Sequence, residues 1–595
     1  MYIFYLFQEE DRGDDGSAGF DYDKVIENDL KTMDPELDQI LNEILEDNEI
    51  LEHDDILFVD CDEEDTLCLH ADSEEEQIHD ADSILLYPGA CVTVGALMLL
   101  LAVFTTKYNL AGDAIQQLLN IIAFTLPNGH KLCTNLYQFK KYFTNLRNPL
   151  VYHYYCSHCL GPIEDSSCKT CPFEFCAKPF DRSKENYFLE IPLKNQIQNL
   201  FAHEDFYENL QHRFKRNTPS GHYEDIYDGM LYKSNFDSHG LLSDPNNISF
   251  TFNTDGAPVF KSSKVSVWPI FLVINELPYK QRMKKENMIL ASLWFGSQKP
   301  SMGTFLKPLQ KTMKELYQGI ECQSPGKGSF ICKGILLCGT ADLPARSLLC
   351  NHMQYNGAYS CWKCEQQGIS ASVGKGQARV FPFDIRTPKG PERTVNSVTE
   401  NAKTAVQNQN AGNTSNYAVK GIKGPSWLLF FPGFNIVTGI AIDYMHGVLL
   451  GVQKLLLELW FLPKHNKKSF NIYHKLCEVD KRLLNIHPTL DITRLPRSIQ
   501  DMKYWKASEY RSFLLFFGAP VLHGVLDHER FSHYLLLVNA MHILLKFGSN
   551  ENDIKRAEHM LIDFCKHFET MYDTCFMRLN VHQLLHLPDS VRNLG

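Results

Sequence analysis

Apolar and polar residues alternate along the middle of the chain, and this period of two is typical of half-buried strands. The pattern predicts three consecutive strands, at residues 248–253, 265–275 and 288–295. Asp255 and Gly256 follow the first of them. Asp-Gly is a common hairpin dipeptide, because glycine accepts a positive φ angle and aspartate bonds its own backbone. The simplest interpretation of Asp255 is therefore a turn between two antiparallel strands.

A spacing of three and four residues replaces the alternation at residues 307–317, where Leu309, Met313 and Leu316 share one face. This spacing predicts a helix whose first turn contains Pro308. The apolar run in "KGILLCGTADLPA" predicts another strand after it. Three meandering strands, a helix and a further strand parallel to the first form the opening of an RNase H-like domain. We therefore predict an α/β core of this type.

Helical spacing dominates the chain on both sides of this core. Before it, residues 92–108, 112–124 and 135–143 predict three helices of a small bundle. After it, the chain is mostly helical from Ile436 onward. The stretch beyond Gln367 is polar and rich in Gly, Asn and Thr, and it predicts a long loop.

Charge is distributed unevenly along the 595 residues. Residues 1–85 carry 30 acidic and 3 basic side chains, so the net charge of −13 divides into −27 for this segment and +14 for residues 86–595. The acidic segment has too little apolar content to offset the entropy of ordering it, and we expect it to be disordered or only locally helical. It either mimics nucleic acid beside a basic body or serves as a solvating tail without a specific partner.

No segment predicts export or insertion into a membrane. The N-terminal "MYIFYLF" has no basic residue before it, and acidic residues follow it, unlike a signal peptide. The apolar run at residues 89–104 has 16 residues, fewer than the ~18 to 20 that span a bilayer. We predict that it is a buried helix. In a chain without a secretory signal, the 18 cysteines are expected to be reduced thiols.

Clustered thiols of this kind favour metal binding. Cys156 and Cys159 form one Cys-x2-Cys pair, and Cys168 and Cys171 form a second pair eight residues later. Two such pairs supply four thiolates to a structural, tetrahedral Zn²⁺. Cys176 is an alternative for one of the four ligands.

A second strand also ends at a carboxylate, because Asp342 follows the apolar run "ILLCGT". If the two strands are neighbours, Asp255 and Asp342 meet in one crevice, where a divalent cation would neutralise their repulsion. Oxygen ligands suit Mg²⁺ or Mn²⁺, and a pair of such ions supports phosphodiester cleavage and strand transfer. Asp255 is thus either a turn residue or a metal ligand.

Four further residues have the chemistry of a second zinc site. Cys361 and Cys364 supply two thiolates, which is half of a tetrahedral site. His582 and His586 are four residues apart on a predicted helix and could supply the other half. Such a site would tie the helical region to the sheet. A histidine pair at this spacing is also common on helix surfaces and in cores.

Five strings occur in the order found in one family: "FNTDGAPVFKSSKVSVWPIFLVINELP", "WFGSQKPSMGTFL", "GTADLPARSLLCNHMQYNGAYSCWKC", "IDYMHGVLLGV" and "NVHQLLHLPDSVRNLG". From about residue 85 onward, the chain resembles the transposases of the CACTA (En/Spm-like) DNA elements. The resemblance implies a DDE/D transposase with an RNase H-like core, interrupted by an all-helical insertion.

The resemblance also assigns roles by position. Asp255 and Asp342 match the first two catalytic acids, Cys361 and Cys364 the Cys-x2-Cys of the insertion, and His582 and His586 its His-x3-His. Asp443 and His446 match a further motif to which the pattern assigns no role; they are otherwise an aspartate at a helix start and a packed histidine.

The sequence departs from the family at the third acid. The resemblance places that acid shortly beyond the His-x3-His, and the chain ends at Gly595, nine residues after His586. Glu509 is the nearest substitute, but it precedes the histidine pair. Two functions are compatible with this departure: a transposase incomplete at its C-terminus, and a catalytically inactive, transposase-derived protein that binds DNA or chromatin.

The expected partners are DNA, bound at transposon ends and target, and further copies of the same chain; no membrane and no small-molecule substrate are expected. The basic strings "HRFKR" and "YKQRMKKEN" are candidate phosphate contacts, solvated faces or nuclear import signals. A transposase acts on chromosomal DNA, so the expected compartment is the nucleus.

The predicted organisation has seven parts. They are an acidic tail at 1–85, a helical bundle at 86–150, a zinc knuckle at 151–182, a helical linker at 183–245, the RNase H-like core at 246–365, a flexible loop at 366–425 and the helical insertion with its histidine pair at 426–595.

Overall fold

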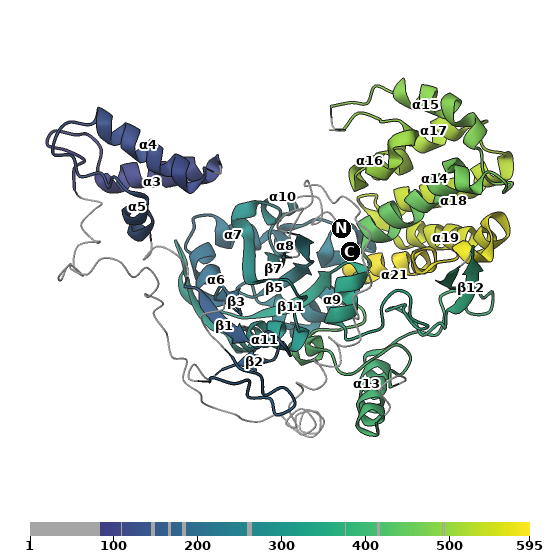
Figure 1. Cartoon of the computed structure of the whole chain (residues 1–595), viewed down its shortest axis with the longest axis horizontal. Helices are drawn as coiled ribbons and strands as arrows, with labels where there is room; N and C mark the ends of the chain where they lie inside the picture. The colour runs from purple at the N-terminus through teal and green to yellow at the C-terminus, as the bar shows by residue number, and fades with distance from the viewer. Residues whose placement is uncertain are drawn as a thin grey trace. The chain divides into compact units, whose positions relative to one another are not determined.

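The computed structural model describes residues 84–595, except for residues 109, 144–148, 165–167, 181–185, 259–264, 375, 413–416, 491 and 493. The predicted acidic tail therefore lies outside the described residues, apart from its last two positions. The described chain is mixed α/β, with a sheet followed by a mostly helical region (Figure 1).

The largest sheet has eight strands in the order β11-β5-β7-β8-β3-β1-β2, and β6 pairs with β7. The strands are β1 (Val151–Tyr155), β2 (Pro162–Ile163), β3 (Tyr187–Glu190), β5 (Ile248–Thr254), β6 (Ala257–Pro258), β7 (Ser266–Ile274), β8 (Met288–Gly296) and β11 (Gly334–Thr340). β5, β7 and β8 form an antiparallel meander, and β11 returns parallel to β5. The three predicted strands and the parallel direction of the fourth are confirmed.

Helices cover both faces of this sheet. On one face, α6 (Leu193–Phe201) and α11 (Met302–Gln318) pack their apolar sides against Phe250 and Leu272 of the sheet. On the other face, Ile335 and Leu337 of β11 pack against residues around α9 (Met230–Phe236). Alternate residues of β11 thus face opposite layers, which explains why this strand is apolar throughout.

The sheet is surrounded by shorter elements. These are α7 (Phe206–Leu210), α8 (His212–Lys215), α10 (Tyr279–Arg282), α12 (Leu343–Leu349), the hairpin of β9 (Ile320–Ser324) and β10 (Gly328–Cys332), and the small pair of β4 (His222–Tyr223) and β14 (Ser549–Asn550).

Helix α11 begins earlier than predicted. Ser301 caps it by accepting a hydrogen bond from the amide of Thr304 at 3.4 Å, so the helix starts at Met302 and Pro308 lies inside it. The prediction that Pro308 lies in the first turn was wrong, because the cap sets the start of the helix.

The prediction treated residues 151–245 as a knuckle and a linker separate from the core. The structure shows instead that this region is part of the same sheet. β1 pairs with β3, and β3 pairs with β8, so this region extends the same sheet. The ring of Tyr155 on β1 stacks on Trp294 of β8 at 4.0 Å between centroids. The short strands β1 to β3 carry little periodic signal, which is why only the pairing reveals them.

Residues 366–425 also differ from the prediction of a flexible loop. They contain a hairpin of β12 (Ile369–Val373) and β13 (Gly376–Val380), followed by the helix α13 (Val395–Asn410). Thr394 and Ser397 form a capping box at the start of α13. Only Val398, Ala402 and Ala405 of the helix are buried. Three small apolar residues give only a weak helical pattern. The polar composition of the segment therefore led to the prediction of a loop.

The region beyond residue 440 is helical, as predicted. It contains a π-helical turn at Met445–Gln453, α14 (Lys454–Phe461), α15 (Leu476–Leu484), α16 (Ala507–Ser512), a π-helical turn at Phe513–Phe517, α17 (Gly518–Leu522), α18 (His528–Leu544), α19 (Glu551–Tyr572), α20 (Leu579–Gln583) and α21 (Leu587–Leu594). Their apolar sides form one continuous core.

The helices between residues 84 and 149 belong to a separate unit. They are α3 (Val94–Lys107), α4 (Gly112–Thr125) and α5 (Leu136–Tyr142), close to the three helices predicted there. Met98, Leu119 and Phe139 meet in their small core. Among the described residues, no helix combines the length and the apolar character needed to cross a bilayer.

His533 makes the stability of the helical region depend on pH. Its buried ring stacks on Phe564 at 4.3 Å, and its Nε2 lies 2.8 Å from the carbonyl oxygen of Phe564. Burial is the largest effect and lowers the pKa of His533 to about 4, with the hydrogen bond to Phe564 opposing it in part. Because the unfolded chain binds this proton near its ordinary pKa of ~6.5, the stabilisation is complete above that pH and is lost as the pH falls toward 4.

We therefore expect the free energy of unfolding to fall by about 3 kcal/mol between pH 6.5 and 4 through this residue. His533→Gln keeps a donor for the Phe564 carbonyl but does not titrate, so it should remove that part of the pH dependence. Chemical denaturation at several pH values measures it. Identical pH dependence in the two proteins would contradict the assignment.

Candidate metal centres and carboxylate site

Cys361, Cys364, His582 and His586 converge in one buried cluster, with one ligand atom from each lying within 4.8 Å of the others. The Sγ of Cys361 lies 3.6 Å from Nε2 of His586, and the Sγ of Cys364 lies 3.2 Å from Nε2 of His582. The two Nε2 atoms are 3.3 Å apart. The two halves come from a loop after the sheet and from α20 with the turn that follows it.

These separations fit a tetrahedral zinc. Bonds of ~2.3 Å to sulfur and ~2.05 Å to nitrogen place ligand atoms about 3.3 to 3.8 Å apart. Burial alone would raise the pKa of Cys361, but hydrogen bonding with Cys364 and the charges of His586 and His582 hold it well below its usual value. A thiolate is the form that binds metal, so the donor set suits Zn²⁺ and Cys361 is already in the binding form.

Hydrogen bonds join the loop that carries the two cysteines to Arg393 and to the segment at residues 436–440. The guanidinium of buried Arg393 donates to the carbonyl oxygens of Cys361 and Cys364 at 3.2 and 3.1 Å. Between the cysteines, the indole N–H of Trp362 donates to Ile436 O at 2.9 Å, and Lys363 Nζ donates to Ile440 O at 2.6 Å. Burial is the main reason that the pKa of Lys363 is lowered to about 8. The loop thereby holds the segment around residues 436–440 in place.

A second group of thiols lies at the edge of the sheet. Cys156, Cys159, Cys171 and Cys176 come within 4.8 Å of one another. The sulfurs of Cys156 and Cys176 are 3.7 Å apart, and those of Cys159 and Cys171 are 3.6 Å apart. These separations also match a tetrahedral zinc, for which sulfur atoms lie ~3.8 Å apart.

At this site the fourth thiol is Cys176, the alternative ligand considered from the sequence. Cys168, predicted from its Cys-x2-Cys spacing, lies outside the group of four, and Cys176 takes its place. The chain between Cys171 and Cys176 forms a tight turn in which the amide of Cys176 donates to Phe173 O at 2.9 Å. This turn returns the fourth thiol to the cluster, and spacing alone does not predict it.

Asp255 and Asp342 occupy equivalent positions just beyond the carboxyl ends of two neighbouring parallel strands. β5 and β11 pair up to Asn253 and Thr340, and each aspartate follows two residues later on its own strand. The side-chain amide of Asn253 donates to Thr340 O at 3.0 Å and joins the two strand ends. The two strands are thus neighbours, which is the condition under which Asp255 and Asp342 are expected to meet.

A backbone amide orients each carboxylate. One oxygen of Asp255 accepts a hydrogen bond from the amide of Gly256 at 2.7 Å. Asp342 is the N-cap of α12, and one of its oxygens accepts from Ala345 N at 2.7 Å. Both side chains are half-buried.

The interpretation of Asp255-Gly256 as a simple hairpin turn was wrong. After Gly256 the chain continues as β6, which pairs with the same strand β7 that β5 pairs with. A Cβ atom on Gly256 would lie 2.6 Å from the ring of Trp268, so glycine is needed here for close packing.

A third carboxylate, Asp443, has the equivalent position on the next chain segment. We call Asp255, Asp342 and Asp443 the carboxylate row. The segment at residues 439–441 runs parallel to β11: the amide of Gly339 donates to Gly439 O, and Ala441 N donates to Gly339 O, both at 2.8 Å. Gly339 and Ile440 are bridge partners. Asp342 and Asp443 each follow three residues after that bridge. Only the tertiary pairing reveals this register, although the motif resemblance singled out Asp443.

His446 is attached to this row. Its Nδ1 is hydrogen bonded to Asp443, and its backbone amide donates to the same carboxylate at 3.1 Å. Burial would lower the pKa of His446, but the hydrogen bond with Asp443 and the negative charges of Asp443, Asp342 and Asp255 outweigh it and raise the pKa. The imidazole thus lies within electrostatic range of all three carboxylates.

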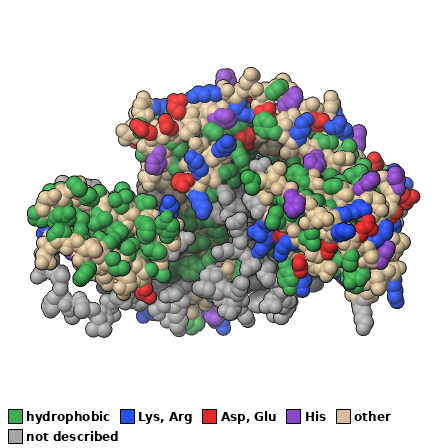
Figure 2. All heavy atoms as spheres, turned by 90° about the horizontal axis from the view of Figure 1, so that it is seen from above, with side chains coloured by type: hydrophobic (Ala, Val, Ile, Leu, Met, Phe, Trp, Pro, Cys, Tyr) green, Lys and Arg blue, Asp and Glu red, His purple; other side chains and the backbone are tan. Residues whose placement is uncertain are grey.

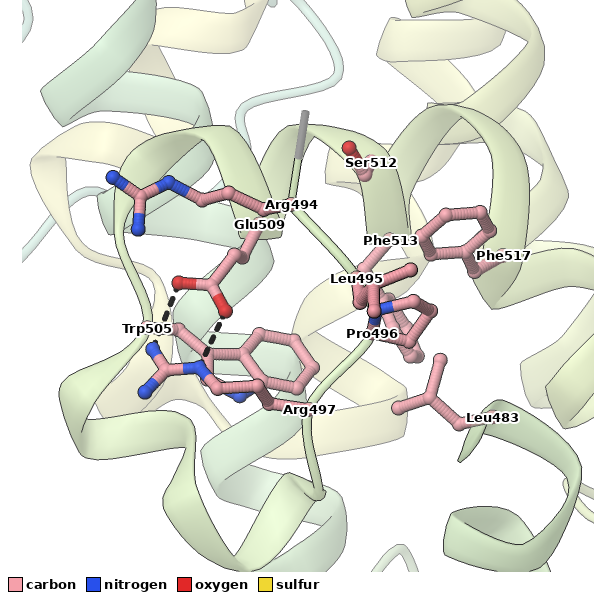
Figure 3. Close-up of a pocket in the computed structure, with 10 residues that line it drawn as sticks. All are labelled: Leu483, Arg494, Leu495, Pro496, Arg497, Trp505, Glu509, Ser512, Phe513 and Phe517. Atoms are coloured by element: carbon pink, nitrogen blue, oxygen red, sulfur yellow. Dashed lines mark hydrogen bonds and ion pairs between the residues drawn. The ribbon is translucent and has the colours of Figure 1, made fainter. Parts of the chain in front are cut away.

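Glu509, the substitute considered for a third acid, has a structural role. Figure 3 shows it in a pocket of the helical region, where its two oxygens accept hydrogen bonds from Arg497 at 2.6 and 2.8 Å. It also caps α16 by accepting from Lys506 N at 2.8 Å. None of the three aspartates lines this pocket.

The comparison with protein families bears on these sites. Residues 223–384 match the model of the transposase family tnp2. The match to tnp2 covers β5, β7, β8, α11 and β11, and with them Asp255, Asp342, Cys361 and Cys364. Asp443 and the two histidines of the zinc cluster lie beyond the tnp2 match. None of the curated proteins matches this sequence. The tnp2 match supports a transposase-type function.

We expect Cys176→Ser to lower the zinc bound by the purified chain by one ion, because it removes one of four ligands from the group at the sheet edge. Elemental analysis after gel filtration measures the metal content. Cys168→Ser is the matched control and should leave the content unchanged. Loss of zinc on Cys168→Ser, with Cys176→Ser unaffected, would restore the ligand set expected from spacing.

Proposed function

We propose that this chain is a DNA transposase of the DDE/D type, related to the CACTA elements, that cuts DNA at transposon ends and joins it to a target. The observation that supports the proposal is the parallel register of β5 and β11, since Asp255 and Asp342 each follow two residues after the last paired position. Both residues lie inside the region that matches the tnp2 family. The order and directions of β11, β5, β7 and β8 also suit an RNase H-like core.

In this proposal, Asp255 and Asp342 hold Mg²⁺ or Mn²⁺. The ions would activate the attacking hydroxyl and stabilise the leaving oxygen of the phosphodiester. The backbone amides of Gly256 and Ala345 fix the orientation of the two carboxylates. The ligand atoms of the aspartates are not among the metal-compatible groups found in the described chain, so cation binding is expected to draw the carboxylates together.

Asp443 is proposed as the third carboxylate of the same site. Its register beside Asp342 supports this role. Its hydrogen bonds with His446 fix the orientation of its carboxylate, and His446 balances part of the negative charge. With Asp443 in this role, the proposed site has three carboxylates without an acid after the His-x3-His.

DNA contacts are proposed for one of the two basic strings. In "HRFKR", Arg213 is buried and donates to Asn247 O at 2.8 Å, and Arg216 is paired with Asp228 at 2.7 Å. These side chains are therefore structural. In "YKQRMKKEN", buried Arg282 pairs with Asp225, whereas the three lysines are exposed: Lys280, Lys284 and Lys285. Exposed lysines suit phosphate contacts.

The role of the zinc ions, the compartment and the number of copies of the chain also belong to the proposal. The two zinc ions would be structural, since four protein ligands leave no position for water. Action on chromosomal DNA would place the protein in the nucleus, and cutting two transposon ends would require more than one copy of the chain.

Asp255→Asn and Asp342→Asn should each lower Mn²⁺-dependent cleavage of a transposon-end DNA by about 10²–10³-fold, because each removes a charged ligand while conserving shape. Gel assays of end-labelled DNA measure the rate. Glu321→Gln, which changes an exposed carboxylate of β9, is the control and should leave it unchanged. Cleavage that survives both aspartate substitutions would contradict the mechanism. DNA binding without cleavage in the unsubstituted chain would favour a catalytically inactive DNA-binding protein.

The role of Asp443 can be tested without cleavage of DNA. Fe²⁺ bound in place of Mg²⁺ and treated with ascorbate and peroxide cuts the backbone near its ligands. We expect protein fragments ending near residues 255, 342 and 443, suppressed by excess Mn²⁺. Mass spectrometry locates the ends. Cuts near the first two positions without the third would rule out Asp443 as a ligand, and no Mn²⁺-sensitive cut at any of them would contradict the cation site itself.

A further inference from the structure

The outer surface of the unit formed by α3, α4 and α5 is unusually apolar. Its exposed large side chains, with their exposed fractions, are Leu99 59%, Leu100 63%, Val103 57%, Phe104 46%, Tyr108 57%, Ile121 62%, Phe124 92% and Tyr137 72%. Figure 2 shows hydrophobic side chains covering most of the visible face of this unit, at the left of the view. Contiguous apolar patches on a soluble protein mark places where another surface binds.

Helix α3 explains how the patch arises. Val94, Met98 and Leu101 form the stripe that faces the small core. The residues between them are also apolar, so Leu100 and Val103 form a second stripe that the core does not use. A helix that is apolar all round is normally buried on every side. With 14 residues, α3 is too short to span a bilayer, so a protein surface is the expected cover.

The net charge of this unit indicates what kind of surface fits the patch. Within the described part of this unit, the basic side chains are Lys107, Lys131, Lys140 and Lys141, and Asp113 is the single acidic one. The unit therefore has a net positive charge. A second copy of the same face would bring like charges together, whereas an acidic, amphipathic segment would complement both the apolar patch and its charge.

The chain itself contains such a segment at residues 36–51, "ELDQILNEILEDNEIL", outside the described residues. Leu37, Ile40, Leu41, Ile44 and Leu45 follow the spacing of one face of a helix. The segment has six acidic and no basic side chains. It is preceded by Asp-Pro, a dipeptide that suits the start of a helix.

We propose that residues 36–51 bind the exposed apolar face of α3 and α4 in the same chain, as an acidic amphipathic helix. Leu41 and its apolar neighbours would cover Leu100 and Val103, and the acidic side chains would lie toward the lysines of this unit. The 32 residues between Leu51 and Ile84 can extend to about 100 Å, several times the ~21 Å length of α3. Tethering at this length gives a millimolar effective concentration, so modest affinity suffices for the helix to be bound.

The test uses the full chain with a photo-crosslinking residue, p-benzoylphenylalanine, in place of Leu100. That side chain is exposed, so the replacement should not disturb the core. Phe547, which is 75% exposed in the other unit, is the control position. A mixture of isotopically light and heavy chains separates crosslinks within one chain from those between two. Hydrogen exchange of the unsubstituted chain gives a second readout, since bound residues 37–45 should be protected.

We expect Leu100 to crosslink to residues 36–51 of the same chain, and the Phe547 position not to do so. Leu41→Glu should lower the yield about tenfold, because it places a charge on the apolar side of the helix. Gln39→Glu adds the same charge on the opposite side and should leave the yield unchanged. Crosslinks between chains, crosslinks to other segments, equal effects of the two substitutions, or unprotected amides at 37–45 would each overturn the proposal.

Discussion

The convergence of Cys361 and Cys364 with His582 and His586 is the constraint on which the arrangement of the main unit depends. The paired residues are 218 and 225 positions apart in sequence, so the cluster closes a loop that contains the helical region except for α21. Trp362 and Lys363 lie between the cysteines and hold the segment before Asp443 against the sheet. One cluster therefore fixes both where the helical region attaches and where the third carboxylate lies.

The carboxylates depend on backbone pairing in the same way. Asp255, Asp342 and Asp443 are far apart in sequence, and they form a row because three chain segments run parallel and end at the same edge. Like charges in a row repel, and a positive group or a cation must offset that repulsion. His446 supplies part of this charge in the chain itself. The backbone pairing thus sets the positions of the three carboxylates, and the neighbouring imidazole offsets part of their repulsion.

The predictions that failed concern segments whose local sequence pattern was weak or was compatible with two structures. Asp-Gly has the composition of a hairpin turn, yet Gly256 is present because Trp268 packs on it. Helix α13 buries only small residues, so its polar surface concealed it. Cys168 has the spacing of a zinc ligand, but a tight turn brings Cys176 to the cluster in its place. In each case a contact with another part of the chain determined which structure formed.

The sequence by itself determined the strands of the central meander, the helical character of the C-terminal region, the two aspartates at strand ends and the cysteines and histidines of the long-range cluster. These features are encoded in periodicity and residue chemistry, which act over a few neighbouring positions. Only the tertiary structure decided that β1 to β3 extend the sheet, that Cys176 is the fourth thiol, and that Asp443 continues the carboxylate row. Each of these depends on the register between distant segments, which is set by pairing and packing across the whole fold and leaves no local periodic signal.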